Sequence, residues 1–239
     1  MPTMLVLGAG SGIARAAVRE FAAAGWDFQL AGRDMGALEA VAAALPAGAP
    51  CFLFDAEDEV SRAGLWPSLP TPPDALLCAV GRLGDQARAR TDHAYARALV
   101  ECNFTGLVPI LGQAAADFEA RGSGLIIGIS SVAGDRGRAS NYVYGAAKAG
   151  FTAYLAGLRA RLWRRGVHVL TVKPGYVATR MIEGRRLPRW LVASPERVGR
   201  DICRAALSRR DVLYTPGWWR PVLAAYRALP ECLAKRWEL

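Results

Sequence analysis

The sequence predicts an α/β domain with a doubly wound parallel sheet, on three observations. Short apolar runs alternate with segments of helical periodicity, a glycine-rich turn follows the first run, and central runs such as Leu125–Ile129 are apolar on both sides. Such alternation is typical of parallel sheets covered by helices on both faces, and doubly apolar strands fit their centre. A chain of 239 residues, 52 % of them hydrophobic, is long enough to bury one such core.

The predicted elements follow one another without a linker or an internal repeat. The expected strands are Met4–Leu7, Phe28–Ala31, Cys51–Phe54, Ala75–Val80, Leu125–Ile129 and Val167–Val172, with a short one at Val212–Tyr214. The expected helices are Ile13–Ala24, Met35–Leu45, Tyr95–Glu119, Tyr144–Arg165 and Pro195–Leu207. We therefore expect a single domain over residues 1–215. An amphipathic aromatic tail, residues 216–239, would pack on that domain, on a partner subunit or on a membrane surface.

Composition excludes several classes of protein. The 30 Lys and Arg residues exceed the 21 Asp and Glu by nine charges, but no nucleic-acid-binding motif accompanies them, so we expect no nucleic-acid partner. The chain has two His and five scattered Cys without a C-x-x-C pair, so we expect neither a metal site nor disulfides. The cysteine pattern favours a reducing compartment. The longest uncharged runs have 15 residues, and the N-terminus lacks a basic signal-peptide region. We expect a cytoplasmic protein.

A glycine turn joins the first strand to the first helix. In the segment Gly8-Ala9-Gly10-Ser11-Gly12-Ile13-Ala14, Gly8 permits a tight turn and Gly12 lets the backbone approach a pyrophosphate. The small Ala14 allows close packing of helix on strand. The spacing differs from G-x-G-x-x-G, whose third small position would fall on Ile13. After the first strand of an alternating chain, the turn favours a nucleotide site of the Rossmann type.

Two charged positions bear on the choice of nucleotide. Arg33 follows the tip of the second strand, where an arginine suits the 2′-phosphate of NADPH and an acid would suit NADH. The alternative is that Arg33 is solvated and Asp34 only caps the next helix. Asp55, after the third strand, would bond an adenine amino group, or it is another acid that begins a helix.

Tyr144 and Lys148 are four residues apart and share one face of a helix. A lysine near a phenol favours the phenolate and lowers the phenol pKa, which makes the tyrosine a usable general acid or base for ketone reduction. The pair alone is a common pattern. Ser131 ends the fifth strand 13 residues earlier, Asn103 lies in another helical segment, and Lys173-Pro174-Gly175-Tyr176-Val177-Ala178-Thr179 follows the sixth strand.

With these motifs in this order, the chain resembles the short-chain dehydrogenase/reductase family over residues 3–215. The glycine turn, N-x-x-G, S-S-x-A-G, Y-x-x-x-K and P-G-x-V-x-T carry the resemblance. It implies NAD(P)-dependent ketone and alcohol chemistry in which Tyr144 donates the proton and Ser131 polarises the carbonyl. Lys148 would bind the nicotinamide ribose and lower the Tyr144 pKa, and Asn103 would hold a relay water.

The resemblance also implies a set of cofactor-binding residues. They are Gly8, Gly10, Ser11, Gly12, Ile13, Arg33, Asp55, Ala56, Ala79, Gly81, Tyr144, Lys148, Pro174, Gly175, Val177 and Thr179. Where the family has N-N-A-G after the fourth strand, this chain has Cys78-Ala79-Val80-Gly81. The side-chain amides that brace the family's central sheet are therefore absent, whereas backbone contact to the ribose can remain.

Three local segments resemble the branch that contains the reductase half of the decaprenylphosphoryl-ribose 2′-epimerase. They begin at Gly81, Ser131 and Tyr214, and the branch also covers bacterial relatives of unassigned substrate. The resemblance implies a lipid-linked 2-keto sugar as substrate and a flavin-dependent oxidase partner that supplies it. Family members commonly form homodimers or homotetramers. The alternatives are a soluble carbonyl or 3-oxoacyl reductase and a non-catalytic NADP-binding subunit.

The residues themselves are compatible with a phosphorylated substrate. Arg180, Arg185 and Arg186 fall in the expected lid, and guanidinium groups suit phosphate, although a solvated basic loop would look the same. Tyr142, whose i+4 partner is Ala146, is expected to pack or to face the substrate. In the tail, Trp218, Trp219, Tyr226 and Trp237 are interleaved with basic residues, which suits either a peripheral contact at the inner membrane face or a neighbouring subunit.

Overall fold

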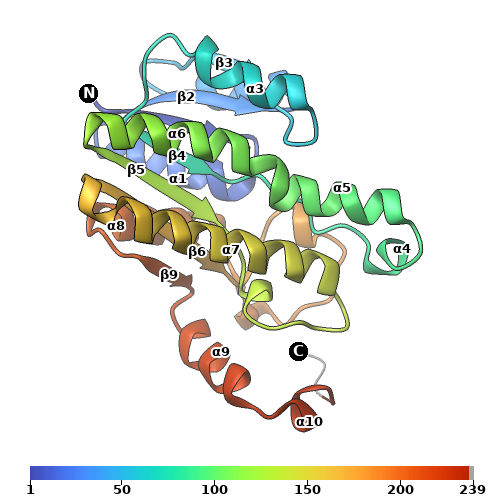
Figure 1. Cartoon of the computed structure of the whole chain (residues 1–239). Helices are drawn as coiled ribbons and strands as arrows, with labels where there is room; N and C mark the ends of the chain where they lie inside the picture. The colour runs from blue at the N-terminus through green and yellow to red at the C-terminus, as the bar shows by residue number, and fades with distance from the viewer. Residues whose placement is uncertain (237–239) are drawn as a thin grey trace.

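The computed structural model describes residues 1–236, and its centre is a seven-stranded parallel sheet in the order β3-β2-β1-β4-β5-β6-β9 (Figure 1). Its strands are β1 (Thr3–Leu7), β2 (Asp27–Gly32), β3 (Cys51–Leu53), β4 (Ala75–Cys78), β5 (Gly124–Ile129), β6 (Val167–Pro174) and β9 (Val212–Thr215). A second, two-stranded parallel sheet pairs β7 (Tyr176–Val177) with β8 (Val192–Ala193). The strand order reverses between β1 and β4, which confirms the doubly wound single domain that the sequence predicts.

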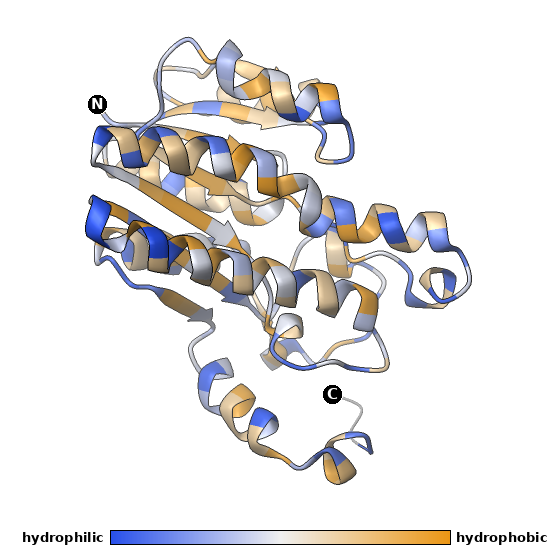
Figure 2. Ribbon diagram, in the orientation of Figure 1, coloured by the Kyte–Doolittle hydropathy of each residue, from blue (hydrophilic) through white to orange (hydrophobic). Residues whose placement is uncertain are grey.

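Helices cover both faces of the large sheet. Alternate side chains of β1 enter different cores: Met4 and Val6 pack with α1 (Gly12–Ala23), α2 (Met35–Ala42) and α8 (Pro195–Leu207). Leu5 and Leu7 pack with α3 (Glu59–Ser68), α6 (Val108–Arg121) and α7 (Tyr142–Leu162). Figure 2 shows the central strands as largely hydrophobic and the outer helix faces as mixed. The sheet is therefore buried on both sides, as its apolar runs require.

One predicted helix, Tyr95–Glu119, is wrong as a single element. The structure divides it into α5 (His93–Asn103) and α6, with a 3-10 turn between them. Pro109 stands in the first turn of α6, where its missing N–H costs no helical hydrogen bond. Gly106 lies so close to the preceding loop that a Cβ on it would be 1.9 Å from the Ala56 carbonyl oxygen. The chain therefore bends here. Helix α5 extends beyond the carboxyl ends of the strands, where α4 (Gln86–Ala89) also lies (Figure 1).

Helix α3 has no counterpart among the predicted elements. Only Leu65 of its ten residues is buried, and Pro67 lies inside it. A helix with so little apolar surface gives a weak periodic signal.

The C-terminal segment continues from β9 into α9 (Trp219–Ala228) and α10 (Glu231–Ala234), beyond the carboxyl end of the sheet. Trp219 and Tyr226 are buried against the rest of the same chain. Trp237, another predicted tail aromatic, lies outside the described residues. Within residues 1–236, no helix combines the length and the apolar character that crossing a membrane requires.

Candidate active site

A cavity of about 790 Å³ lies at the carboxyl ends of the central strands. The glycine turn, the ends of β4 and β5, the start of α7 and the loop after β6 line it. A smaller cavity of about 330 Å³ shares several of its lining residues and extends to β2 and β3. Ligands of open α/β sheets bind at this edge, where the strand order reverses.

The cavities bring together most of the residues that the sequence singles out. The larger one is lined by Gly10, Ser11, Gly12, Ile13, Arg33, Ala79, Gly81, Ser131, Tyr144, Lys148, Pro174, Gly175, Val177, Thr179, Arg180 and Arg185. The smaller one adds Gly8, Asp55 and Ala56. Three predicted site residues line neither cavity: Asn103, Tyr142 and Arg186.

The glycine turn is shaped by close backbone approaches. Gly8 has φ of 75°, and a Cβ on it would lie 3.0 Å from the backbone of Ala79. A Cβ on Gly12 would lie 2.8 Å from Thr179 Cγ2. Ser11 caps α1 by accepting a hydrogen bond from the Ala14 N–H at 3.2 Å. The turn therefore presents the N-terminus of α1 to the cavity, where a pyrophosphate would be favoured.

Both features proposed at the end of β2 are present. Asp34 caps α2, with its Oδ1 accepting from the Ala37 N–H at 3.0 Å. Arg33 is exposed and lines both cavities. A capping role for Asp34 therefore does not prevent Arg33 from meeting a ligand.

Asp55 does not begin a helix, because Asp58 is the residue that caps α3. The backbone N–H of Asp55 donates to Ser61 Oγ at 2.9 Å, and its own Oδ1 accepts from the Glu57 N–H at 3.0 Å. The side chain is thereby fixed at the smaller cavity, beside the position expected for an adenine.

Tyr144 and Lys148 share one face of α7 and are 6 % and 2 % exposed. Lys148 Nζ donates to two carbonyl oxygens, of Ile129 at 3.1 Å and of Val80 at 3.3 Å. These are the ends of β5 and the loop after β4, so the lysine joins α7 to the sheet at the cavity floor. Burial lowers the pKa of Lys148 to about 8.

The expectation that Lys148 lowers the pKa of Tyr144 is wrong for this structure. Burial raises the pKa of the Tyr144 phenol to about 12, and a hydrogen bond with Ser131 opposes that rise only in part. The physical reason is that the ammonium is directed at two carbonyls while the phenol loses its water. At neutral pH the phenol therefore keeps its proton, as a proton donor must.

Ser131 lies at the end of β5 and begins the 3-10 turn η2 (Val132–Gly134). Its Oγ accepts from the Ala133 N–H at 3.1 Å, which fixes the turn. A Cβ on Gly134 would lie 2.8 Å from the backbone of Lys148, so the turn packs directly on α7. This packing sets Ser131 beside Tyr144.

Asn103 is fully buried and uses its side-chain amide within the protein. Nδ2 donates to the carbonyls of Arg82 and Leu99, both at 2.8 Å, and Oδ1 accepts from the Arg82 N–H at 3.1 Å. A Cβ on Gly81 would lie 3.0 Å from that Oδ1 and 3.1 Å from Lys148 Nζ. Asn103 thus holds the loop after β4 next to Lys148.

Sequence reasoning missed several lining residues, above all Arg15 and Arg82. Arg15 lies four residues after Ser11, one helical turn along α1, and Arg82 directly follows Gly81. Both positions were open to prediction from their neighbours. Six cationic side chains and no carboxylate occur among the described residues that line the larger cavity: Arg15, Arg33, Arg82, Lys148, Arg180 and Arg185.

The residues present fit a nicotinamide dinucleotide. Gly8 and Gly12 let the turn pack closely on Ala79 and Thr179 at the cavity wall, and α1 presents its N-terminus. The guanidinium of Arg33 is available to both cavities, which this residue lines, and Asp55 lines the smaller one. The part of the larger cavity near Tyr144 and Lys148 would hold the nicotinamide ring.

Comparisons with known proteins agree with this geometry. A family model described as short chain dehydrogenase matches residues 2–189. An uncharacterized oxidoreductase of Mycobacterium tuberculosis is 39 % identical over 90 % of this chain and 88 % of its own. One from Streptomyces coelicolor is 34 % identical over 98 % of this chain and 95 % of its own.

A solved structure is also similar. A putative betaketoacyl-ACP reductase superposes with a TM-score of 0.79 and 28 % identity, covering 89 % of this chain and 95 % of its own. The match over residues 2–189, together with these relatives, shows that the chain belongs to the short-chain dehydrogenase family and is an oxidoreductase.

Proposed function

We propose that this protein is an NADPH-dependent ketoreductase whose substrate is a keto sugar that carries phosphate, of the polyprenyl-phosphate-linked 2-keto pentose type. The observation that carries the proposal is the charge of the larger cavity, which holds six cations and, among its described lining residues, no carboxylate. One of the six, Arg82, pairs with Glu57 at 3.4 Å, and the other five favour a cofactor and a substrate that both carry phosphate. The resemblance to the reductase half of the decaprenylphosphoryl-ribose epimerase supports the same substrate class.

NADPH is the cofactor that Arg33 favours, because a guanidinium forms charge-assisted hydrogen bonds with a phosphate. Ser11, Gly12 and the N-terminus of α1 would hold the pyrophosphate, and Val177 and Thr179 would hold the carboxamide end. When bound, the cofactor supplies the hydride for the carbonyl carbon.

The chain's own groups would then manage the proton. Ser131 donates a hydrogen bond to the substrate carbonyl oxygen, and Tyr144 gives that oxygen its phenolic proton. Lys148, cationic below about pH 8, would bind the nicotinamide ribose and joins α7 to the ends of β4 and β5 through the carbonyls of Val80 and Ile129. Asn103 keeps Gly81 against Lys148 and so preserves the floor on which these groups stand.

The phosphate of the substrate would lie with Arg180 and Arg185 at the lid. Arg180 begins the 3-10 turn η4 (Arg180–Ile182), and both arginines line the larger cavity, whereas the exposed Arg186 lies outside it. Trp190, farther along the lid, is 75 % exposed. An exposed tryptophan among arginines suits a lipid headgroup layer, so we propose that the lid is also where the protein would contact a membrane surface.

A soluble 3-oxoacyl reductase is the second candidate. The similarity to a putative betaketoacyl-ACP reductase favours it. That reading predicts turnover of small acyl ketones without any need for lipid.

NADPH oxidation by the purified full-length protein would test the proposal. The substrates are ribulose 5-phosphate, ribulose, an acetoacetyl thioester and a polyprenyl-phosphoryl 2-keto pentose with and without liposomes. We expect the phosphorylated sugars to exceed ribulose in kcat/KM, and Arg185→Met to remove that difference. Arg161→Met, which deletes an arginine paired with Glu119 far from the cavity, serves as the matched control. Equal turnover of ribulose and ribulose 5-phosphate, or activity on the thioester alone, would refute the substrate class.

A further inference from the structure

A buried ion pair lies directly behind the turn that carries Ser131. Asp135, which ends this turn, pairs with Lys173 of β6, and the two side chains are 2 % and 8 % exposed. Asp135 Oδ2 also accepts a hydrogen bond from Tyr214 Oη at 2.7 Å. The three residues come from the Ser131 turn, from β6 just before Pro174, and from β9. The cluster therefore ties the Ser131 turn to β6 and β9, which stand next to the part of the cavity that holds Tyr144.

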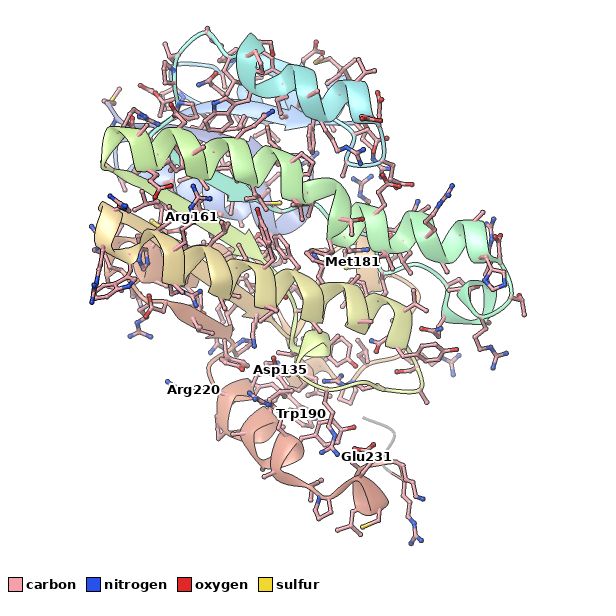
Figure 3. All side chains as sticks on the ribbon, viewed as in Figure 1. Asp135, Arg161, Met181, Trp190, Arg220 and Glu231 are labelled. Carbon is pink, nitrogen blue, oxygen red and sulfur yellow. The ribbon has the colours of Figure 1, made fainter. Side chains whose placement is uncertain are left out.

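The next residue, Arg136, extends this fastening to the C-terminal segment. Its Nη1 donates to the carbonyl oxygens of Leu229, at 2.9 Å, and of Tyr226, and its Nη2 pairs with Glu231 at 2.7 Å. These carbonyls stand at the C-terminal end of α9, where a cation is favoured. Figure 3 places Asp135 beside α9 and Glu231 at the far end of the same segment.

Apolar packing joins the same elements. Val132, in the turn after Ser131, packs with Trp219 and Leu223 of α9 in a small core apart from the two large ones. On the opposite side, a Cβ on Gly145 of α7 would lie 2.9 Å from the Ala133 carbonyl oxygen. The turn is thus wedged between α7 and α9. This turn therefore carries the contact between α9 and the Ser131 side of the cavity, while Trp219 also packs on Gly175 of the loop after β6.

We propose that Arg136 is a positioning residue for the reaction: by holding the end of α9 it fixes the turn that places Ser131 beside Tyr144. This inference rests on the roles proposed above for Ser131 and Tyr144. The C-terminal segment acts here as an inner support of the active site. Arg136 lines neither cavity. We therefore expect its loss to disturb the alignment of the substrate carbonyl and to leave the affinity for the cofactor unchanged.

Three variants and two readouts test this. Arg136→Met removes all the donors, Arg136→Lys keeps one cation, and Arg161→Met removes an arginine–glutamate pair that joins α7 to α6 far from the turn. We expect Arg136→Met to exchange the amide hydrogens of residues 131–136 about tenfold faster, with no change at residues 8–14. On the best ketone of the panel above, its kcat falls about 10- to 100-fold while the Kd for NADPH stays at the wild-type value. Arg136→Lys recovers part of both effects, and Arg161→Met shows neither.

The inference is overturned if Arg136→Met leaves exchange in residues 131–136 unchanged, or if kcat and NADPH affinity decline together. The exchange readout needs no substrate, so it stands even if no ketone is reduced. Loss of activity in Tyr144→Phe with full activity in Arg136→Met would leave the proposed function intact and reject the positioning role alone.

Discussion

The nucleotide side and the substrate side of the cavity are held together by different means. On the nucleotide side, close approaches of Gly8 to the Ala79 backbone and of Gly12 to the Thr179 side chain set the shape, and the side-chain caps of Ser11 and Asp34 reach only three residues along the chain. On the substrate side, Asp135 and Arg136 reach partners 38 to 95 residues away. The difference teaches that the polar side chains of the nucleotide half are held by local caps, whereas those of the substrate half are held by partners far along the chain.

Apart from the loss of the proton donor Tyr144, the largest effect is expected where the two sides meet, at Ser131. Ser131→Ala removes the donor to the carbonyl oxygen, and we expect kcat to fall about 10²- to 10³-fold with NADPH affinity unchanged. Steady-state kinetics with NADPH fluorescence titration checks this. Ser194→Ala, which deletes a comparable cap from α8, controls for the lost hydrogen bond to the turn. A kcat equal to that of the control would separate Ser131 from the chemistry.

Arg33 offers a change confined to the nucleotide side. Arg33→Ala should raise the KM for NADPH about 10- to 100-fold, the value of one charge-assisted pair, and leave the KM for NADH near its wild-type value. Initial-rate measurements with both cofactors give the ratio. If NADPH and NADH are affected alike, Arg33 does not read the 2′-phosphate.

A substitution at Gly175 tests the contact between the loop after β6 and the C-terminal segment. A Cβ there would lie 1.8 Å from Trp219 Nε1, so Gly175→Ala should lower the free energy of unfolding by about 1–3 kcal/mol. Gly217→Ala, with nothing within 4 Å of its added methyl, should cost far less. Urea denaturation of the two variants makes the comparison. Equal stability would mean that Trp219 does not press on the loop.

Within one pH unit above about pH 8, the smallest effect is a pH dependence that both sides share. Lys148, with its pKa lowered to about 8, is cationic below that pH and neutral above it. We expect kcat/KM for reduction to be level below about pH 8 and to fall about tenfold per unit above it, since this ratio reports groups of the free enzyme. A profile that stays level to pH 10 would show that the Lys148 charge is not required.

The sequence predicts the nucleotide side well because its determinants are local. Each motif is visible within a few residues: the glycine spacing, Arg33 at the end of a strand, and the i, i+4 pair of Tyr144 and Lys148. The parallel sheet follows from the alternation of apolar runs with helical segments. The bend that separates α5 from α6 was missed because it depends on Gly106 meeting the Ala56 carbonyl, a contact across the fold.

The substrate side shows the limit of the same reasoning. The lowered pKa expected for Tyr144 was wrong because the burial of a phenol and the direction of a lysine are tertiary properties. Asp135, Arg136 and Lys173 look like solvated charges in the sequence, and only the fold brings them to Tyr214 and α9. The aromatic tail was left open between three surfaces, and in the described residues its Trp219 is buried within its own chain.

The most direct test of the account is the rate of NADPH oxidation in a single turnover by wild-type protein and by Tyr144→Phe, on the best phosphorylated ketone. We expect the variant to bind NADPH as tightly as the wild type and to react about 10²- to 10⁴-fold more slowly, because the proton donor is gone. An unchanged rate in Tyr144→Phe would contradict the central claim that this phenol delivers the proton.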